Sequence, residues 1–431
     1  MERAALSDLL AWKANPHRKP LILNGARQVG KTWLLKEFGR RHYDRVAYVN
    51  FESNERMNRL FASNLDVDRL LLGLRVEAEC PIEPERTLII FDEIQDNPRA
   101  LTALKYFAET APGYHVAAAG SLLGVALHAG AAFPVGKTDF LSLHPLAFAE
   151  FVHALGEAPL HELLRSGPLP DIELFRPRLI ELLRQYYCVG GMPEAVAAFA
   201  ATKDFAAVRE IQKNLLYAYE RDFSKYGRTE IVPRIRAVWN SIPAQLAREQ
   251  RKFVYGVVKE GARAREYETA VDWLCDAGLL RKVRRVANPG LPLKSYVEQG
   301  AFKLYMLDVG LLASHAGVPV SALVHGDEAF EEFKGALTEQ YVSQELAIMP
   351  DVEVYYWSAD RAEAEVDFLV QRGTDITPIE VKAAENLQAK SLRSYRDKFA
   401  PSRCYRISLS SWREEAWLSN IPLYATARMW G

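Results

Sequence analysis

The sequence has few cysteines, no excess of charge of one sign and no long hydrophobic run. The four cysteines among 431 residues (Cys80, Cys188, Cys275 and Cys404) are widely spaced, which excludes a disulfide framework and a cysteine-based metal cluster. Lys and Arg number 54 against 55 Asp and Glu, which excludes a uniformly basic nucleic-acid binder and an acidic disordered chain. We therefore expect a cytoplasmic protein in which any contact with nucleic acid is confined to a local patch.

One uncharged stretch, residues 115–136, could be mistaken for a membrane span. It is rich in Ala and Gly, contains two histidines and includes Pro134, so it is a poor match to the hydrocarbon core of a bilayer. We interpret it as a buried strand followed by a loop, and we expect no membrane partner. The length of the chain predicts several domains.

A glycine-rich segment follows the first predicted strand. The run 25–32 reads Gly25-Ala26-Arg27-Gln28-Val29-Gly30-Lys31-Thr32, and apolar residues at helical spacing come after it. This is the G-x-x-x-x-G-K-T pattern of a P-loop, whose backbone N–H groups point at phosphate oxygens. Lys31 would reach the β- and γ-phosphates and the Thr32 hydroxyl would ligate Mg²⁺. The pattern predicts ATP and Mg²⁺ as cofactors; a plain glycine-rich turn is the alternative.

Two carboxylates end the next strongly apolar strand. The run 87–91 is apolar apart from Thr87 and is followed by Asp92 and Glu93, about 60 residues after the P-loop. Ligands of parallel sheets bind at the carboxyl ends of the strands. Asp92 would hold Mg²⁺ through water, and Glu93 would activate the attacking water. The sequence therefore predicts an ATP hydrolase in which Lys31 and Glu93 are catalytic.

Five segments together resemble a known family. They are GARQVGKT, LIIFDEIQ, AAGSLLGV, FPVGK followed by HPLAFAEF, and YYCVGGMPEAV, in that order, and the resemblance extends over about residues 11–423. The family consists of bacterial and archaeal AAA-type ATPases with a C-terminal DUF4143 region, placed here at roughly 215–390. The resemblance implies that Ser121 lies near the γ-phosphate and that Pro193 packs near the adenine. The alternatives are a turn-capping serine and a simple helix boundary.

The middle of the chain fits a winged helix. Helical apolar stripes near 235–242 and 267–274 are followed by predicted strands at 281–286 and 302–307. Residues 248–294 contain 11 Lys or Arg and 6 Asp or Glu, a difference of +5. Such a patch could bind DNA phosphates, or the module could contact a protein partner. The sequence does not separate these two interpretations.

The last hundred residues resemble a restriction-endonuclease-like PD-(D/E)xK core. Glu339 lies on a predicted helix, Asp367 on a strand, and Glu380 and Lys382 share one face of the next strand. Asp367 and Glu380 would ligate Mg²⁺, Lys382 would stabilise charge, and Glu339 would orient water or complete the metal shell. A surface salt-bridge pattern is the alternative. Whether such a site cleaves nucleic acid stays open.

We therefore predict an α/β protein in four parts. They are a P-loop ATPase core with a parallel sheet (1–155), a helical lid (156–232), a winged helix (233–330) and a nuclease-like α/β domain (331–431). The ATPase would couple its nucleotide state to the C-terminal effector, with DNA as one candidate ligand. The alternative function is a signalling switch whose C-terminal half binds a protein without catalysis. Homo-oligomerisation stays open.

Overall fold

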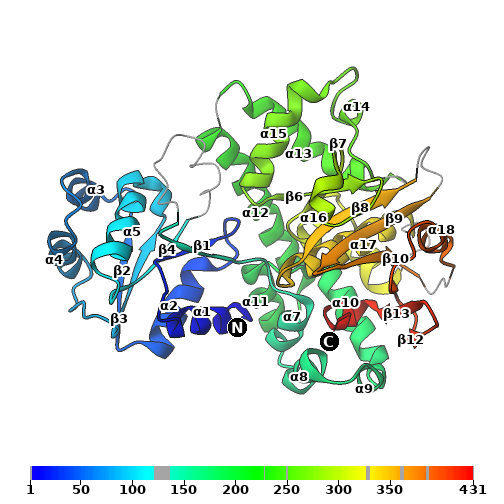
Figure 1. Cartoon of the computed structure of the whole chain (residues 1–431), viewed down its shortest axis with the longest axis horizontal. Coiled ribbons are helices and arrows are strands. Elements are labelled where there is room, and N and C mark those ends of the chain that lie inside the picture. Colours follow the sequence, from blue (N-terminus) through cyan, green and yellow to red (C-terminus); the bar gives the residue numbers. More distant parts are fainter. Residues whose placement is uncertain are drawn as a thin grey trace. The chain divides into compact units, whose positions relative to one another are not determined.

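The computed structural model describes residues 2–120, 136–227, 229–248, 251–326, 331–359, 364–384 and 388–430 (Figure 1). The chain divides into two compact units. The N-terminal unit comprises Glu2–His144 with Asp276–Gly278, and the C-terminal unit comprises Pro145–Cys275 with Leu279–Gly431. Within the described residues, no helix combines the length and apolar character needed to cross a membrane.

The N-terminal unit is built on a five-stranded parallel sheet in the order β2-β3-β4-β1-β5. Its strands are β1 (Leu21–Asn24), β2 (Arg45–Asn50), β3 (Thr87–Asp92), β4 (His115–Ala119) and β5 (Asp139–Ser142). Every residue of β3 and β4 is buried, as expected for central strands of a sheet covered on both faces. The predicted parallel α/β core is confirmed.

Helices cover this sheet (Figure 1). They are α1 (Ala5–Ala14), α2 (Lys31–His42), α3 (Glu55–Ala62), α4 (Val67–Glu77) and α5 (Pro98–Thr110). Apolar residues of α3, α4 and α5 form one core with Ala47, Val49, Ile89 and Phe91 of the sheet. Helix α2 packs against α1, β2, β3 and β4. The P-loop connects β1 to α2 and so lies at the carboxyl end of the sheet, where ligands of such folds bind.

The C-terminal unit contains an eight-stranded mixed sheet in the order β12-β13-β11-β10-β9-β8-β6-β7. Its strands are β6 (Leu280–Val286), β7 (Val297–Met306), β8 (Glu353–Ser358), β9 (Glu365–Arg372), β10 (Asp375–Val381), β11 (Cys404–Ser408), β12 (Arg413–Glu414) and β13 (Leu418–Pro422). Strands β8, β9 and β10 form an antiparallel meander, which places Glu365 and Asp367 on the strand beside Glu380.

The C-terminal unit also contains helices. They are α7 (Phe148–Ala154), α8 (Ala158–Ser166), α9 (Leu169–Glu173), α10 (Arg176–Val189), α11 (Pro193–Thr202), α12 (Phe205–Tyr226), α13 (Val232–Leu246), α14 (Tyr255–Val258), α15 (Ala264–Asp276), α16 (Val309–His315), α17 (Glu331–Ile348) and α18 (Lys390–Phe399). The two long helices are α12 and α17. Helix α17 packs against β7, β8 and β10, and α18 packs against β9 and β10.

The elements predicted for a winged helix occur in the expected order, as α13, α15, β6 and β7. The strand pair is not an isolated hairpin, because β6 also pairs in parallel with β8, at Arg284↔Tyr355 and Arg285↔Tyr356. The parts predicted as winged helix and nuclease-like domain therefore share one sheet. The winged-helix assignment and the four-part division stay predictions.

Candidate functional site

The P-loop has the backbone that its two glycines allow. Gly30 has φ 95° and precedes the first residue of α2. Gly25 has φ 152°, and a Cβ there would lie 2.4 Å from the carbonyl oxygen of Leu143. Any larger residue at position 25 would therefore displace the strand-end backbone. Gln28 also has positive φ, at 66°. The loop is a tight curl that leads directly into the N-terminus of α2, where an anion is stabilised.

Lys31 lies inside this curl. Its side chain is 8% exposed, and its Nζ donates to the carbonyl oxygens of Gly25, at 2.8 Å, and Ala26, at 2.7 Å. Burial lowers the pKa of Lys31 to about 8, although Glu93 and Asp92 oppose that shift. The ammonium group thus rests on carbonyls of its own loop and is available for a phosphate bound there.

Asp92 and Thr32, the two predicted Mg²⁺ ligands, are hydrogen-bonded to each other. The Thr32 hydroxyl donates to both carboxylate oxygens of Asp92, at 3.1 and 2.9 Å, and Asp92 is 5% exposed. The Tyr48 hydroxyl donates to Oδ2 of Asp92 at 2.8 Å, and the Glu93 backbone N–H donates to Oδ1 at 3.2 Å. Within the described ranges, Asp92 forms no salt bridge with a lysine or arginine. A hydroxyl and a carboxylate are the hard oxygen ligands that Mg²⁺ takes, so the residues fit that ion.

Glu93 follows Asp92 in the left-handed region, with φ 49°. A non-glycine residue in this region signals backbone strain of the kind found at functional sites. The Gln95 side-chain amide donates to Oε2 of Glu93, which fixes the orientation of the carboxylate. The role of Glu93 as general base stays a prediction.

Two residues of this site were missed by the sequence analysis. Tyr48 lies on β2, next to β3, and its neighbour in the register is Ile90. Arg3 is buried, and its guanidinium donates to the carbonyl oxygens of Val29, at 3.1 Å, and His144, at 2.6 Å. Arg3 thus supports the P-loop from a segment that carries no motif. In the sequence, only the alternation of side-chain types along β2 could have pointed to Tyr48.

Two predicted nucleotide contacts stand apart from this geometry. Ser121 lies outside the described residues. Pro193 opens α11 in the C-terminal unit, after Gly190 and Gly191. A Cβ at Gly190 would lie 2.1 Å from Oδ1 of Asp308, and the Gly191 N–H donates to Oδ2 of Asp308 at 2.6 Å. Close packing on Asp308 therefore accounts for Gly190, and close approach to the Leu146 carbonyl, 2.2 Å from a Cβ at Gly191, accounts for Gly191. The adenine contact of Pro193 stays a prediction.

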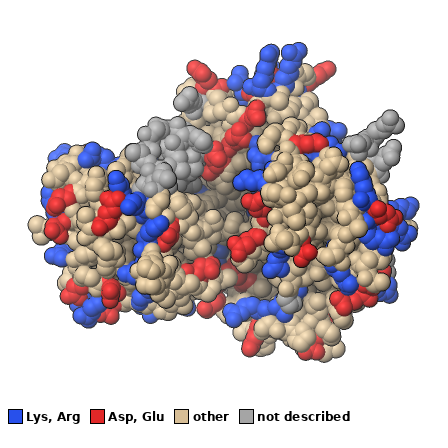
Figure 2. All heavy atoms as spheres, viewed as in Figure 1, with Lys and Arg blue, Asp and Glu red and all other residues tan. Residues whose placement is uncertain are grey.

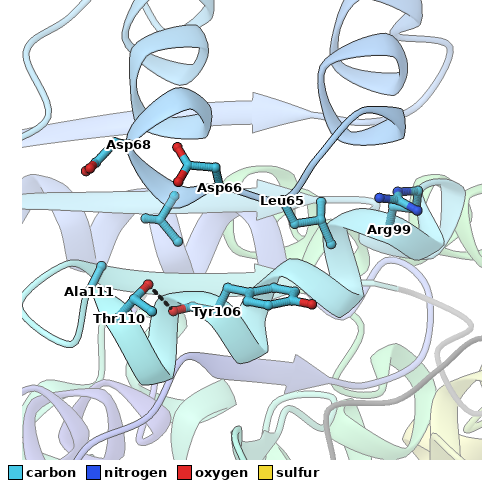
Figure 3. Close-up of a pocket in the computed structure, with 8 residues that line it drawn as sticks. Leu65, Asp66, Asp68, Arg99, Tyr106, Thr110 and Ala111 are labelled. Carbon is cyan, nitrogen blue, oxygen red and sulfur yellow. Dashed lines mark hydrogen bonds between the residues drawn. The ribbon is translucent and has the colours of Figure 1, made fainter.

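A pocket of about 410 Å³ in the N-terminal unit lies away from the P-loop (Figure 3). It is lined by Leu65, Asp66, Val67, Asp68, Arg99, Tyr106, Thr110 and Ala111. Asp66 caps α4 by accepting from the Arg69 N–H at 2.9 Å, and Arg99 donates to the Phe61 carbonyl at 2.7 Å. These polar groups serve the fold, and none of the predicted nucleotide-binding residues lines the pocket.

The four nuclease-like residues lie on the expected elements but have different contacts. Glu380 and Lys382 pair with each other, with 2.8 Å between Oε1 and Nζ. Asp367 accepts from the Val381 N–H at 2.7 Å. Glu339, on α17, instead contacts Lys303 of β7, with 3.1 Å between Oε1 and Nζ. Among the described residues, no group of three or more His, Cys, Asp or Glu side chains is arranged to hold a metal ion.

Two cations that the sequence analysis did not include in this site neutralise its carboxylates. Lys303 Nζ lies 2.6 Å from Glu365 and 3.9 Å from Asp367, and the Arg251 guanidinium donates to Glu339. Burial would raise the pKa of Glu339, but Arg251 and Lys303 hold it below its usual value. Burial, and next the charge of Glu339, raise the pKa of Asp367 above its usual range.

Most basic residues of the predicted wing contact the protein itself. Arg281 donates to the Ser343 carbonyl at 2.6 Å, Lys282 pairs with Asp272 at 2.6 Å, and Arg285 pairs with Glu298 at 2.8 Å. Exposed cations remain around α14 and the start of α15, and Figure 2 shows Lys and Arg there with Asp and Glu beside them. They are Lys252, Lys259, Arg263 and Arg265.

Comparison with protein-family models decides the identity of the N-terminal unit. Residues 17–152 match an AAA domain, which contains the P-loop and the Asp92–Glu93 strand. The N-terminal unit therefore contains an AAA domain of the P-loop type. Residues 334–424 of the same chain match DUF4143, a domain of unknown function, so the predicted resemblance is confirmed. Residues 180–322 match DUF8612, another domain of unknown function. The DUF4143 match thus begins and ends later than the roughly 215–390 expected from the sequence.

Two archaeal proteins are among the solved structures that match this chain. One is the Walker-type ATPase PABY2304 of Pyrococcus abyssi, with 14% identity, a TM-score of 0.47, and coverage of 73% of this chain and 95% of that one. The other is the ORC1 protein of Aeropyrum pernix in complex with DNA, with 14% identity, a TM-score of 0.31, and coverage of 74% and 93%. No curated protein matches the sequence.

Proposed function

We propose that this AAA-type protein binds ATP with Mg²⁺ at its P-loop and hydrolyses it slowly. The observation that carries the proposal is the convergence of the P-loop and β3: Lys31 lies inside the loop, and Thr32 is hydrogen-bonded to Asp92. The AAA-domain match supports nucleotide binding at the level of the family. Thr32 and Asp92 would hold Mg²⁺, which would neutralise charge that develops on the phosphates.

The residues of the chain then have separate tasks. The backbone N–H groups of residues 25–32 bind the phosphates, and Lys31 exchanges the carbonyls of Gly25 and Ala26 for phosphate oxygens. Glu93, oriented by Gln95, accepts a proton from water as the water oxygen bonds to the γ-phosphorus. The bond between that phosphorus and the β–γ bridging oxygen breaks, and ADP leaves with the electron pair.

Substitution of Glu93 tests this assignment. We expect Glu93→Gln to bind ATP with wild-type affinity and to lose turnover by roughly 100-fold or more, because the amide cannot accept the proton. Nucleotide affinity by calorimetry and phosphate release measure the two effects separately. Unchanged turnover in the variant would move the general base to another residue.

We further propose that nucleotide state is passed to the C-terminal unit, which acts as the effector. DNA is one candidate ligand, because Lys252, Lys259, Arg263 and Arg265 are exposed. A signalling switch that binds a protein partner is the second candidate. It is favoured by the engagement of Arg281, Lys282 and Arg285 within the chain, since these cations are not free to meet phosphates.

A DNA-binding titration at several salt concentrations separates the two candidates. DNA binding predicts an affinity that falls steeply with salt, changes when ATP and Mg²⁺ are added, and weakens in Lys259→Ala and Arg263→Ala. Lys213→Ala, an exposed lysine on α12 paired with Glu210, is the matched control. Absence of binding at low salt would leave the protein-binding switch as the effector function.

A further inference from the structure

The nuclease-like site contains a buried lysine that its motif does not include. Lys303, on β7, has no exposed side-chain surface, and its Nζ faces three carboxylates. The distances are 3.1 Å to Oε1 of Glu339, 2.6 Å to Oε1 of Glu365 and 3.9 Å to Oδ1 of Asp367. Two of these residues, Glu339 and Asp367, are ones that a metal-dependent nuclease would use. A cation of the protein thus stands among the carboxylates to which a divalent metal would bind.

Both carboxylate oxygens of Glu339 accept further hydrogen bonds. Its Oε2 accepts from the guanidinium of Arg251, whose Nε donates to the Leu246 carbonyl at 3.2 Å. Its Oε1 accepts from the buried hydroxyl of Tyr305 as well as from Lys303. Glu339 could ligate a metal only if it gave up contacts to two cations and a hydroxyl. The Tyr305 hydroxyl would then lose the carboxylate, Lys303 would keep Glu365, and Arg251 would keep the Leu246 carbonyl. Metal binding would have to exceed the cost of these buried losses.

The second half of the motif does not offer a complete site. One carboxylate oxygen of Glu380, Oε1, forms an ion pair with Lys382. The other oxygen, Oε2, is buried and has no hydrogen-bond partner among the described residues. One carboxylate oxygen of Asp367 accepts a hydrogen bond from the Val381 N–H. A divalent ion seated beside these two carboxylates would lie close to the ammonium of Lys303, and two cations in a poorly solvated site repel each other strongly.

We propose that Lys303 is a built-in counter-ion that replaces a divalent metal in this site. The C-terminal unit then binds no Mg²⁺ or Mn²⁺ there and cleaves no phosphodiester, and the carboxylate cluster joins β7, β9 and α17. This goes beyond the proposed ATPase function and does not depend on it, since the P-loop lies in the other unit. It also gives Glu339 the role of an ion-pair partner in place of the water-orienting role expected from the motif.

The test measures Mn²⁺ binding to the nucleotide-free full chain, by calorimetry and by electron paramagnetic resonance of free Mn²⁺. Wild type is expected to show no saturable site that depends on Asp367. Removal of the ammonium in Lys303→Ala is expected to create a saturable Mn²⁺ site, at least roughly tenfold tighter than any residual binding by wild type. That gained binding should disappear in the double variant Lys303→Ala/Asp367→Asn. Asp92→Ala is the control for any weak binding at the P-loop.

Thermal unfolding provides the second readout. Lys303→Ala in EDTA should melt roughly 5 °C or more below wild type, and Mn²⁺ should restore part of that loss. Lys303→Arg, which keeps a cation, should gain no Mn²⁺ site. If Lys303→Ala does not fold, Lys303→Met replaces it, because methionine fills a similar volume without charge.

Three results would overturn the proposal. The first is saturable Mn²⁺ binding by wild type that is lost in Asp367→Asn. The second is metal-dependent DNA nicking by wild type that Asp367→Asn abolishes. The third is a folded Lys303→Ala or Lys303→Met variant that gains no Mn²⁺ site. ATP turnover measured on the same preparations keeps a failure here distinct from a failure of the ATPase assignment.

Discussion

The two units each place buried carboxylates near a lysine, yet the carboxylates have different partners. At the P-loop, Asp92 accepts from the neutral hydroxyls of Thr32 and Tyr48, and Lys31 contacts backbone carbonyls. In the C-terminal unit, Glu339 and Glu365 contact Lys303 directly, and Lys303 has no exposed side-chain surface. Neutral partners leave a carboxylate charge available for an external cation, whereas a buried ammonium already neutralises it. The same residue types therefore support a ligand site in one unit and an internal ion cluster in the other.

The largest expected effect is on the P-loop site of the N-terminal unit. We expect Lys31→Ala to lower ATP turnover by roughly 100-fold or more and to weaken ATP binding, because it removes the cation that reaches the phosphates. Turnover and fluorescent-nucleotide binding measure the effect. The control is Lys105→Ala, an exposed lysine on α5 of the same unit. Near-wild-type ATP binding by Lys31→Ala would refute the P-loop assignment.

The second prediction concerns stability in the C-terminal unit. Lys303→Met leaves buried carboxylates without their cation, so we expect a loss of about 3–5 kcal/mol in the free energy of unfolding. Removal of an exposed pair in Lys213→Ala should cost about 0–1 kcal/mol. Urea unfolding followed by circular dichroism compares the two. Equal stabilities of the two variants would mean that Lys303 contributes no more than a surface ion pair.

The third prediction uses pH to distinguish the two lysines. The pKa of Lys31 is lowered to about 8, so its cationic form is complete below pH 7 and is lost as the pH rises through 8. ATP affinity should therefore fall progressively between pH 7 and pH 9.5. Lys31→Arg should show no such decline, since a guanidinium stays charged over this range. Burial would lower the pKa of Lys303, but Glu339, Glu365 and Asp367 hold it above its usual value, so Lys303 should stay cationic over the same range.

The smallest effect tests the neutral partners of Asp92. Tyr48→Phe removes one hydroxyl donor and keeps the ring over which Lys36 Nζ lies at 3.5 Å. The loss of one hydrogen bond to a carboxylate is worth about 1–2 kcal/mol, so we expect turnover to change by roughly fivefold to thirtyfold. Steady-state kinetics at several Mg²⁺ concentrations measure the effect. A loss as large as that of Lys31→Ala would show that Tyr48 has a larger role than positioning Asp92.

The P-loop could be predicted from the sequence because its chemistry is local. Gly25, Gly30, Lys31 and Thr32 lie within eight residues, and β3 delivers Asp92 to the same sheet edge by the rules of parallel sheets. The fold class followed from the same alternation of strands and helices. The supporting contacts of Arg3 and Tyr48 could not be predicted, since they join segments that carry no motif.

The C-terminal site shows why the rest could not be predicted. The helix and strands that carry Glu339, Asp367 and Glu380 appear where their periodicity indicated. Their partners come from elsewhere: Lys303 precedes Glu339 by 36 residues, and Arg251 precedes it by 88. A sequence motif indicates which residues lie on the same helix or strand. The charged side chains that neutralise those residues depend on how distant strands pack. A catalytic motif and an ion cluster can therefore have the same sequence pattern.

The most direct test counts Mn²⁺ ions per chain in the presence of a slowly hydrolysed ATP analogue. We expect one nucleotide-dependent Mn²⁺ in wild type, no such ion in Asp92→Ala, and one in Asp367→Asn. A second ion in wild type that disappears in Asp367→Asn would contradict the role of Lys303. Retention of the nucleotide-dependent ion in Asp92→Ala would contradict the assignment of the P-loop site.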